Sequence, residues 1–230
     1  IFILEFLKTH LIILSFIFLF LAILCVAIAA PTFAGEYQTG GDSILRTTKH
    51  GRTRLAVTKI LAAFTLFYCY FPCWSHGTYS DFECSVRDGL LKTSFQMLYS
   101  IINLPNINLG QLQIILAAVG LLSVLATVSC TLFLSAKCKD TLTVLLISIV
   151  VLLLPLFCLC GDGRKHGSLP YFHLPELVCR TTFFISLQIL TYLHIGGMSF
   201  WTPHVILLSA GIELFVFTFL AIHSYCRHQV

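Results

Sequence analysis

The segment "YSIINLPNINLGQLQIILAAVGLL", Tyr99 to Leu122, decides the fold, because a polar stretch broken by proline runs directly into a long apolar run. The apolar residues continue without a charge from Gln111 to Ala136. A helix needs about 20 consecutive apolar residues to cross a bilayer. The segment therefore predicts a membrane-spanning helix over about 111–136.

The rest of the chain has the composition of an integral membrane protein. Of its 230 residues, 57% are hydrophobic and only 10% are charged, and the mean hydropathy is +0.91. Soluble domains of this size do not carry such values. The formal net charge of +4 is too small, and the basic residues too little interleaved with aromatic ones, to indicate a nucleic-acid partner.

We expect one all-α integral membrane domain over 1–230, with helices at about 9–34, 111–136, 141–161 and 203–226. The first of these runs has an alternative, because "CVAIAAPTFAG" contains the small residues of a signal-peptide cleavage site. Its length favours a retained helix. Two further apolar runs, Leu55 to Pro72 and Thr181 to Ile195, leave five or six helices open.

The short turn "KCKD", Lys137 to Asp140, sets the expected orientation. Its two lysines place it in the cytoplasm, so loops over about 35–110 and 162–202 face outward and both chain ends lie inside. A basic run from Arg46 to Lys59 falls in the outward loop, and long loops tolerate such charges. In the competing layout, Leu55 to Pro72 is a helix and the basic run lies on its cytoplasmic side.

The first loop also admits strands. The run "LAAFTLFYCYF", Leu61 to Phe71, is aromatic and is followed by turn-forming residues. Periodicity alone does not separate a short buried strand from a buried helix. In the four-helix layout this run belongs to a small extracellular sheet.

Several stretches resemble the claudin and peripheral-myelin-protein superfamily. The approach to the second helix has Tyr99-Ser100, two isoleucines, Leu104-Pro105 and then Leu112-Gln113 in the family's order. The first helix ends in "AIAAPTFAG", which is similar to the family's proline-aromatic exit. Thr65-Leu66-Phe67 with Cys69 resembles the tryptophan-and-cysteine strand of the first loop, and Ser199-Phe200-Trp201 resembles the start of the fourth helix in clarins.

This resemblance implies a four-transmembrane-helix bundle with a small extracellular β-sheet built from the first loop. It also implies a disulfide between Cys69 and Cys84, which would stabilise the sheet by roughly 2–4 kcal/mol. Cys73 is the rival partner for Cys84, and a second pair, Cys160 with Cys179, is open across the third loop.

Glu213 is the ionisable residue that the apolar pattern singles out, because it lies midway along the last helix with no cation within a turn. An acid inside a membrane is costly and by default indicates a functional site. It can bind a polar group of a partner helix, line an ion or proton path, or be protonated and hydrogen-bonded inside the bundle. The small residues Ser209, Ala210 and Gly211 beside it favour close helix packing.

No motif indicates catalysis. The nine histidines form no HExxH pair, and the chain has no GxSxG, no phosphate-binding glycine loop and no paired carboxylates. We therefore expect a protein that is not an enzyme and has no metal or cofactor site. Known activities of the superfamily are likewise non-enzymatic.

The resemblance is to the clarin and calcium-channel-γ side of the superfamily, since the first loop is long and the tail after Cys226 is short. It implies a multi-pass plasma-membrane protein that acts as an accessory subunit of a larger membrane complex such as an ion channel. We expect the partner contacts at the aromatic residues Phe67, Trp74 and Trp201. One alternative is a junction or adhesion protein that self-associates through its outer loops. Another is a six-helix transporter or membrane enzyme.

Overall fold

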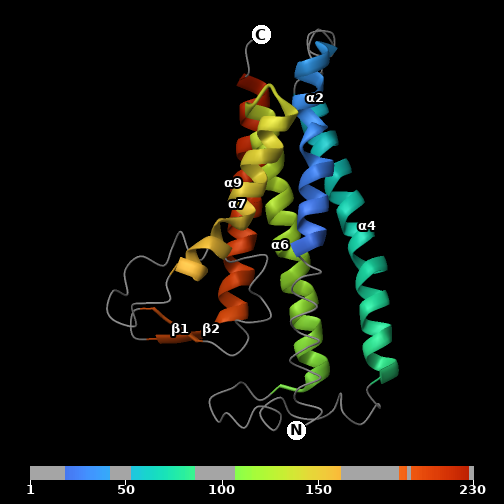
Figure 1. Cartoon of the computed structure of the whole chain (residues 1–230), viewed down its shortest axis with the longest axis vertical. Helices are drawn as coiled ribbons and strands as arrows, with labels where there is room; N and C mark the ends of the chain where they lie inside the picture. The colour runs from blue at the N-terminus through green and yellow to red at the C-terminus, as the bar shows by residue number, and fades with distance from the viewer. Residues whose placement is uncertain (1–18, 42–52, 86–106, 162–191, 196–197, 228–230) are drawn as a thin grey trace.

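The computed structural model describes residues 19–41, 53–85, 107–161, 192–195 and 198–227 (Figure 1). Residues 19–29 are helical and continue into α2, and a further four helices and a strand pair follow. In chain order these elements are α2 (Pro31–Thr39), α4 (Thr53–Ser85), α6 (Leu109–Lys137), α7 (Thr141–Gly161), β1 (Tyr192–Ile195), β2 (Met198–Trp201) and α9 (Thr202–Arg227).

Three helices are long and apolar enough to cross a membrane, which identifies the chain as a membrane protein. They are Leu19–Thr39, Gly110–Lys137 and Pro203–Arg227. Within α7, Thr141–Leu153 is a shorter apolar helical stretch. Each of the three exceeds the ~20 residues that span a bilayer.

The helical hairpin of α6 and α7 begins and ends within two residues of the bounds expected for each helix. The Asn108 backbone N–H donates to Gln111 Oε1 at 3.1 Å, a capping-box contact that fixes the start of α6. At the other end the Cys138 N–H donates to the Leu134 carbonyl at 2.9 Å. The turn "KCKD" then leads directly into α7 at Thr141.

The strands expected within 61–71 are wrong, because α4 is one helix across this whole run. Ala56, Ile60, Ala63 and Phe67 recur every three or four residues and are all buried in the same core cluster. That spacing places them on one face of a helix, whereas a strand would divide them between two faces. The alternative of a helix over Leu55 to Pro72 is confirmed.

The described chain thus contains five helices instead of the four expected. The helix Leu19–Thr39, α6 and α9 run in one direction, and α4 and α7 run back (Figure 1). The end of α2, the start of α4, the α6–α7 turn and the end of α9 consequently lie together. We call this the basic end, because its exposed cations are Arg54, Lys137, Lys139 and Arg227.

The strand pair lies before the last helix and not in the first loop. β1 and β2 are antiparallel, with Tyr192 opposite Trp201 and His194 opposite Ser199. The residues Ser199 to Trp201, expected to start the last helix, therefore belong to β2, and α9 begins at Thr202. Of the apolar run Thr181 to Ile195, only 192–195 is described, as strand β1.

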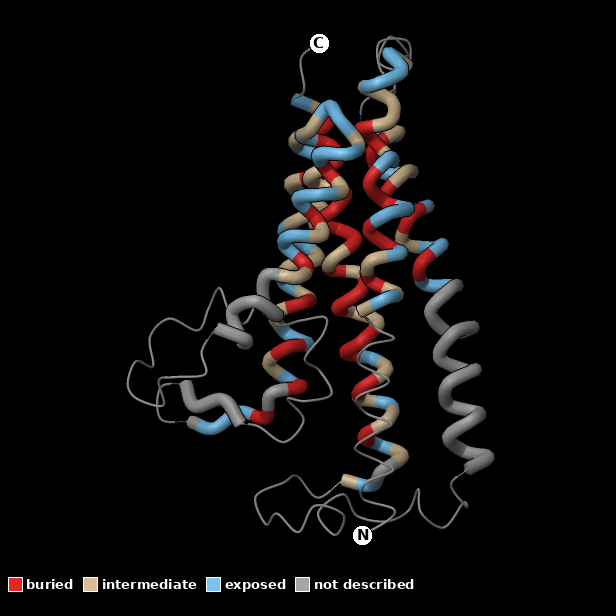
Figure 2. The backbone as a smooth tube through the Cα atoms, in the orientation of Figure 1, coloured by how far each residue is buried: buried red, intermediate tan, exposed pale blue. Residues whose placement is uncertain are grey.

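α6 lies at the centre of the bundle, and α9 is its least covered membrane helix. Val124, Val128, Leu132 and Ala136 of α6 recur every four residues within the main core cluster. Buried residues concentrate between the helices toward the basic end (Figure 2). Half of the apolar stretch of α6 (50%) is buried, against 17% for α9, so α9 leaves more of its surface uncovered than α6 does.

Candidate functional site

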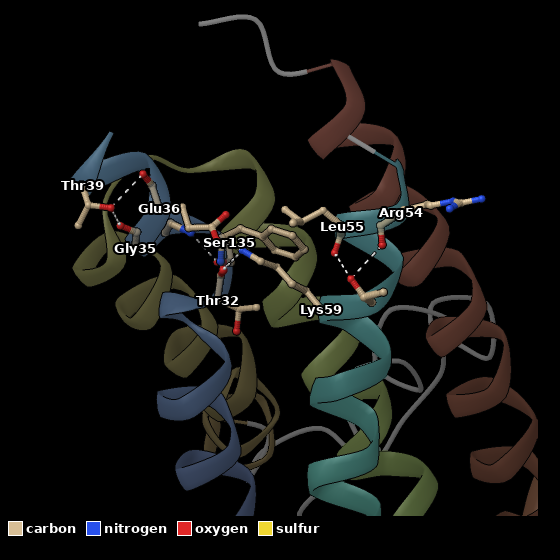
Figure 3. A network of polar contacts seen from close by, with 11 residues as sticks. Thr32, Gly35, Glu36, Thr39, Arg54, Leu55, Lys59 and Ser135 are labelled. Carbon is tan, nitrogen blue, oxygen red and sulfur yellow. Dashed lines mark hydrogen bonds and ion pairs between the residues drawn. The ribbon is translucent and has the colours of Figure 1, made fainter. Parts of the chain in front are cut away.

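A proline interrupts the backbone hydrogen bonding of the first helix, and Ser135 of α6 binds the backbone at this point (Figure 3). Pro31 has no N–H and begins α2 immediately after Ala30. The backbone N–H groups of Phe33 and Ala34 donate to Ser135 Oγ at 3.1 and 3.0 Å, and this hydroxyl donates to the Ala30 carbonyl at 2.7 Å. The Ser135 hydroxyl thus uses its one proton and both lone pairs on a backbone that the proline has opened.

One turn further along, Lys59 of α4 forms an ion pair with Glu36 of α2. Lys59 Nζ also donates to the Thr32 carbonyl at 3.2 Å and lies 5.4 Å from the centre of the Phe33 ring. The two charged side chains are 21% and 23% exposed. A cation in this position is stabilised by a carboxylate, a carbonyl and an aromatic face at once.

Aromatic rings join this ion pair to the last helix. The Phe33 and Tyr225 ring centres lie 4.9 Å apart, and Tyr37 stacks on Tyr225 at 6.4 Å. The Tyr37 hydroxyl donates to the Ala136 carbonyl at 3.2 Å. We call the set Phe33, Glu36, Lys59, Ser135 and Tyr225 the Lys59 joint, because it connects α2, α4, α6 and α9.

The chemistry of the Lys59 joint is that of a fixed structural contact. Lys59, Glu36 Oε1 and the Ser135 hydroxyl bind one another or the backbone, while Glu36 Oε2 is buried without a hydrogen-bond partner among the described residues. No nucleophile lies against a base in this joint. Over the described ranges, no three metal-binding side chains converge. The sequence pattern did not single out Glu36. Lys59 indicated that such a residue exists, because a cation within an apolar run requires an anionic or polar partner.

The sequence-predicted residue Glu213 lies apart from this joint, on α9. It is half-buried, and its carboxyl makes no hydrogen bond or ion pair with any described residue. At helical spacing its side of α9 also carries Ser209, Val216 and Leu220. We call these four residues the Glu213 flank; it borders the exposed apolar stripe of α9. Of the neighbouring small residues, Ala210 is buried in the bundle.

Two of the three aromatic residues expected to contact a partner are buried within the chain. Phe67 is 5% exposed and belongs to the main core cluster, so its side chain offers little surface to a partner. Trp201 is 8% exposed, and its ring lies 5.2 Å from that of His204. It too offers little surface to a partner. Trp74 lies on α4, and its side chain is outside the described residues.

The disulfide between Cys69 and Cys84 is also corrected. Cys69 is a free, exposed thiol on α4, and Cys84 belongs to the same uninterrupted helix. Fifteen residues of helix separate two Cα atoms by about 22 Å, whereas a disulfide requires less than about 7 Å. Cys73 and Cys160 lie on helices whose side chains are undescribed there, and Cys179 is outside the described residues.

Comparisons with protein-family models, with curated proteins and with solved structures find no match to the chain.

Proposed function

We propose that the chain is a non-enzymatic, multi-pass plasma-membrane protein that serves as an accessory subunit of a larger membrane protein such as an ion channel. The partner binds along the Glu213 flank of α9. The observation that carries this proposal is a carboxyl on a membrane helix without a bonding partner among the described residues. An acid without a partner inside the membrane has an unfavourable free energy, and a hydrogen-bond donor on a neighbouring protein lowers it.

Two properties of α9 support lateral contact there. It is the least covered of the three membrane helices, and Val216 on the Glu213 flank is 48% exposed. Ser209 lies one turn before Glu213, and its hydroxyl donates to the Ile206 carbonyl of the same helix at 2.9 Å. This side chain is therefore small and already has an acceptor for its proton. Small residues let a second helix approach closely, which is what drives helix association in lipid.

The orientation follows from the charges at the helix ends. We place the basic end in the cytoplasm, because cytoplasmic loops carry an excess of lysine and arginine. α4 then crosses the membrane. Its 33 residues reach about 50 Å, more than the ~30 Å hydrocarbon core, and it packs on α6 and α9.

The contact along the Glu213 flank does not depend on the resemblance to claudins, whereas the plasma-membrane location and the channel partner are what that resemblance implies. Thr65 to Cys69, which resembled a first-loop strand, lie in a helix. Tyr99 to Pro105 lie outside the described residues. A relation to the superfamily accordingly stays a prediction based on short motifs.

Replacing Glu213 by leucine is expected to weaken association with the partner about fivefold, because an interhelical polar contact in a membrane contributes roughly 1 kcal/mol. The measurement is photo-crosslinking in cells that produce the chain naturally, with a benzophenone amino acid at Val216. Val216 should give a discrete adduct with another membrane protein, and Glu213→Leu should reduce its yield. Leu208→Ala, on the exposed stripe, is the control and should leave the yield unchanged.

An adduct of twice the chain's own mass would instead identify self-association, as in the adhesion alternative. Equal yields from Val216 in the parent chain and in the Glu213→Leu variant would contradict a role for the carboxyl.

A further inference from the structure

The two ends of the bundle carry unequal charge. At the basic end, Arg54, Lys137, Lys139 and Arg227 are exposed, and Asp140 is the one exposed acid of the described residues there. At the opposite end, the described residues 107–116 and 198–204 contain no lysine, arginine, aspartate or glutamate, and the last turns of α4 contain Asp81 and Glu83. We propose that the basic end binds the headgroups of anionic phospholipids in the leaflet that it faces.

The stability of the helices does not account for all of these charges. Lys137 and Arg227 lie in the last turns of α6 and α9, where a cation is favoured by the helix dipole. Arg54 lies in the first turn of α4, where the dipole disfavours it, and Lys139 lies in the turn between two helices. Helix stability therefore does not explain why Arg54 and Lys139 are cationic. An anion that binds them from outside the chain does explain it.

The cations are also free to bind. None of the four forms an ion pair within the described part of the chain, in contrast to Lys59, which Glu36 neutralises. Asp140 immediately precedes α7, where an acid favours the helix start, so its presence has a local reason. The remaining net positive charge lies where helices leave the apolar layer, at the depth of lipid headgroups.

A phospholipid is the occupant that fits this position. Its acyl chains lie along the exposed apolar side chains of α7, such as Leu142 and Leu146, while its headgroup reaches the α6–α7 turn. A basic cluster at a membrane surface attracts anionic lipids, and the attraction falls with salt. This inference goes beyond the contact proposed on α9, because Glu213 lies in the interior of that helix; either can fail alone.

The test uses the full chain in a neutral detergent, with lipid binding followed by native mass spectrometry. Short-chain phosphatidylserine should bind at least about tenfold more tightly than short-chain phosphatidylcholine, because each nearby cation attracts the anionic headgroup. The variant Lys137→Gln/Lys139→Gln/Arg227→Gln should lose at least about tenfold in phosphatidylserine affinity and none in phosphatidylcholine affinity. The matched variant Lys137→Arg/Lys139→Arg/Arg227→Lys keeps the charge and should keep the affinity.

Two further arms separate a lipid site from a site for any anion. Glycerophosphoserine, which has the headgroup without acyl chains, should bind at least tenfold more weakly than the lipid. Equal binding of glycerophosphoserine, equal binding of the two lipids, or an unchanged affinity of the glutamine variant would each overturn the proposal. Arg54→Gln changes no helix C-terminus, and this single variant should weaken phosphatidylserine binding. It provides the same test if the triple variant does not fold.

Discussion

Replacing Lys59 by glutamate is expected to destabilise the bundle strongly. The substitution puts a second carboxylate beside Glu36, removes the cation from the Phe33 ring and leaves the Thr32 carbonyl without its donor. Breaking a buried ion pair costs about 3–5 kcal/mol; because both side chains are about a fifth exposed, we expect roughly 2–4 kcal/mol. The measurement is the unfolding temperature of the purified chain in a neutral detergent.

The control is Lys137→Glu, which reverses an exposed charge and should shift the unfolding temperature far less. The double variant Glu36→Lys/Lys59→Glu restores the opposite charges and should recover most of the loss. If Lys59→Glu and Lys137→Glu lowered the unfolding temperature equally, Lys59 would not be part of a stabilising joint.

Replacing Ser135 by alanine is the second large effect that we expect. The variant leaves the Ala30 carbonyl and the N–H groups of Phe33 and Ala34 without the hydroxyl that binds them. Each buried unsatisfied polar group costs about 1–3 kcal/mol, and after partial relaxation of the helix we expect a total loss of roughly 2–4 kcal/mol. Thermal unfolding in the same detergent measures it.

Ser129→Ala is the matched control, because Ser129 is buried on the same helix and donates only to the Ala126 carbonyl, at 2.7 Å. It should cost little. In a Pro31→Ala background the first helix can close its own hydrogen bonds, so Ser135→Ala should cost less there than in the parent chain. Equal costs in the two backgrounds would show that Ser135 does not act through the proline break.

The sequence was sufficient to predict a helix and its ends where a long apolar run stops at charged residues. The hairpin of α6 and α7 is predicted to within two residues because "KCKD" interrupts two uncharged runs that have no other stable state in a bilayer. α9 likewise lies within one residue of the expected 203–226, although Ser199 to Trp201, which resembled the start of that helix, join a strand pair.

The sequence was insufficient for α4, because aromatic residues within 61–71 suit a strand as well as a helix. The buried set Ala56, Ile60, Ala63 and Phe67 decides between them only once α6 and α9 are known to face it. The same holds for the Lys59 joint. Glu36 and Lys59 lie on different helices, and no local pattern states which helix faces which.

We propose that α4 crosses the membrane and that the basic end lies in the cytoplasm, and cysteine accessibility in intact cells tests this most directly. Thr39→Cys, Asn108→Cys and Lys139→Cys are each treated with a membrane-impermeant maleimide, and labelling above that of the parent chain with its ten cysteines is measured. All three positions are exposed at helix ends. We predict that only Asn108→Cys is labelled before the cells are permeabilised. Labelling of both Thr39→Cys and Asn108→Cys, with Lys139→Cys protected, would contradict the account, because α4 would then not cross the membrane.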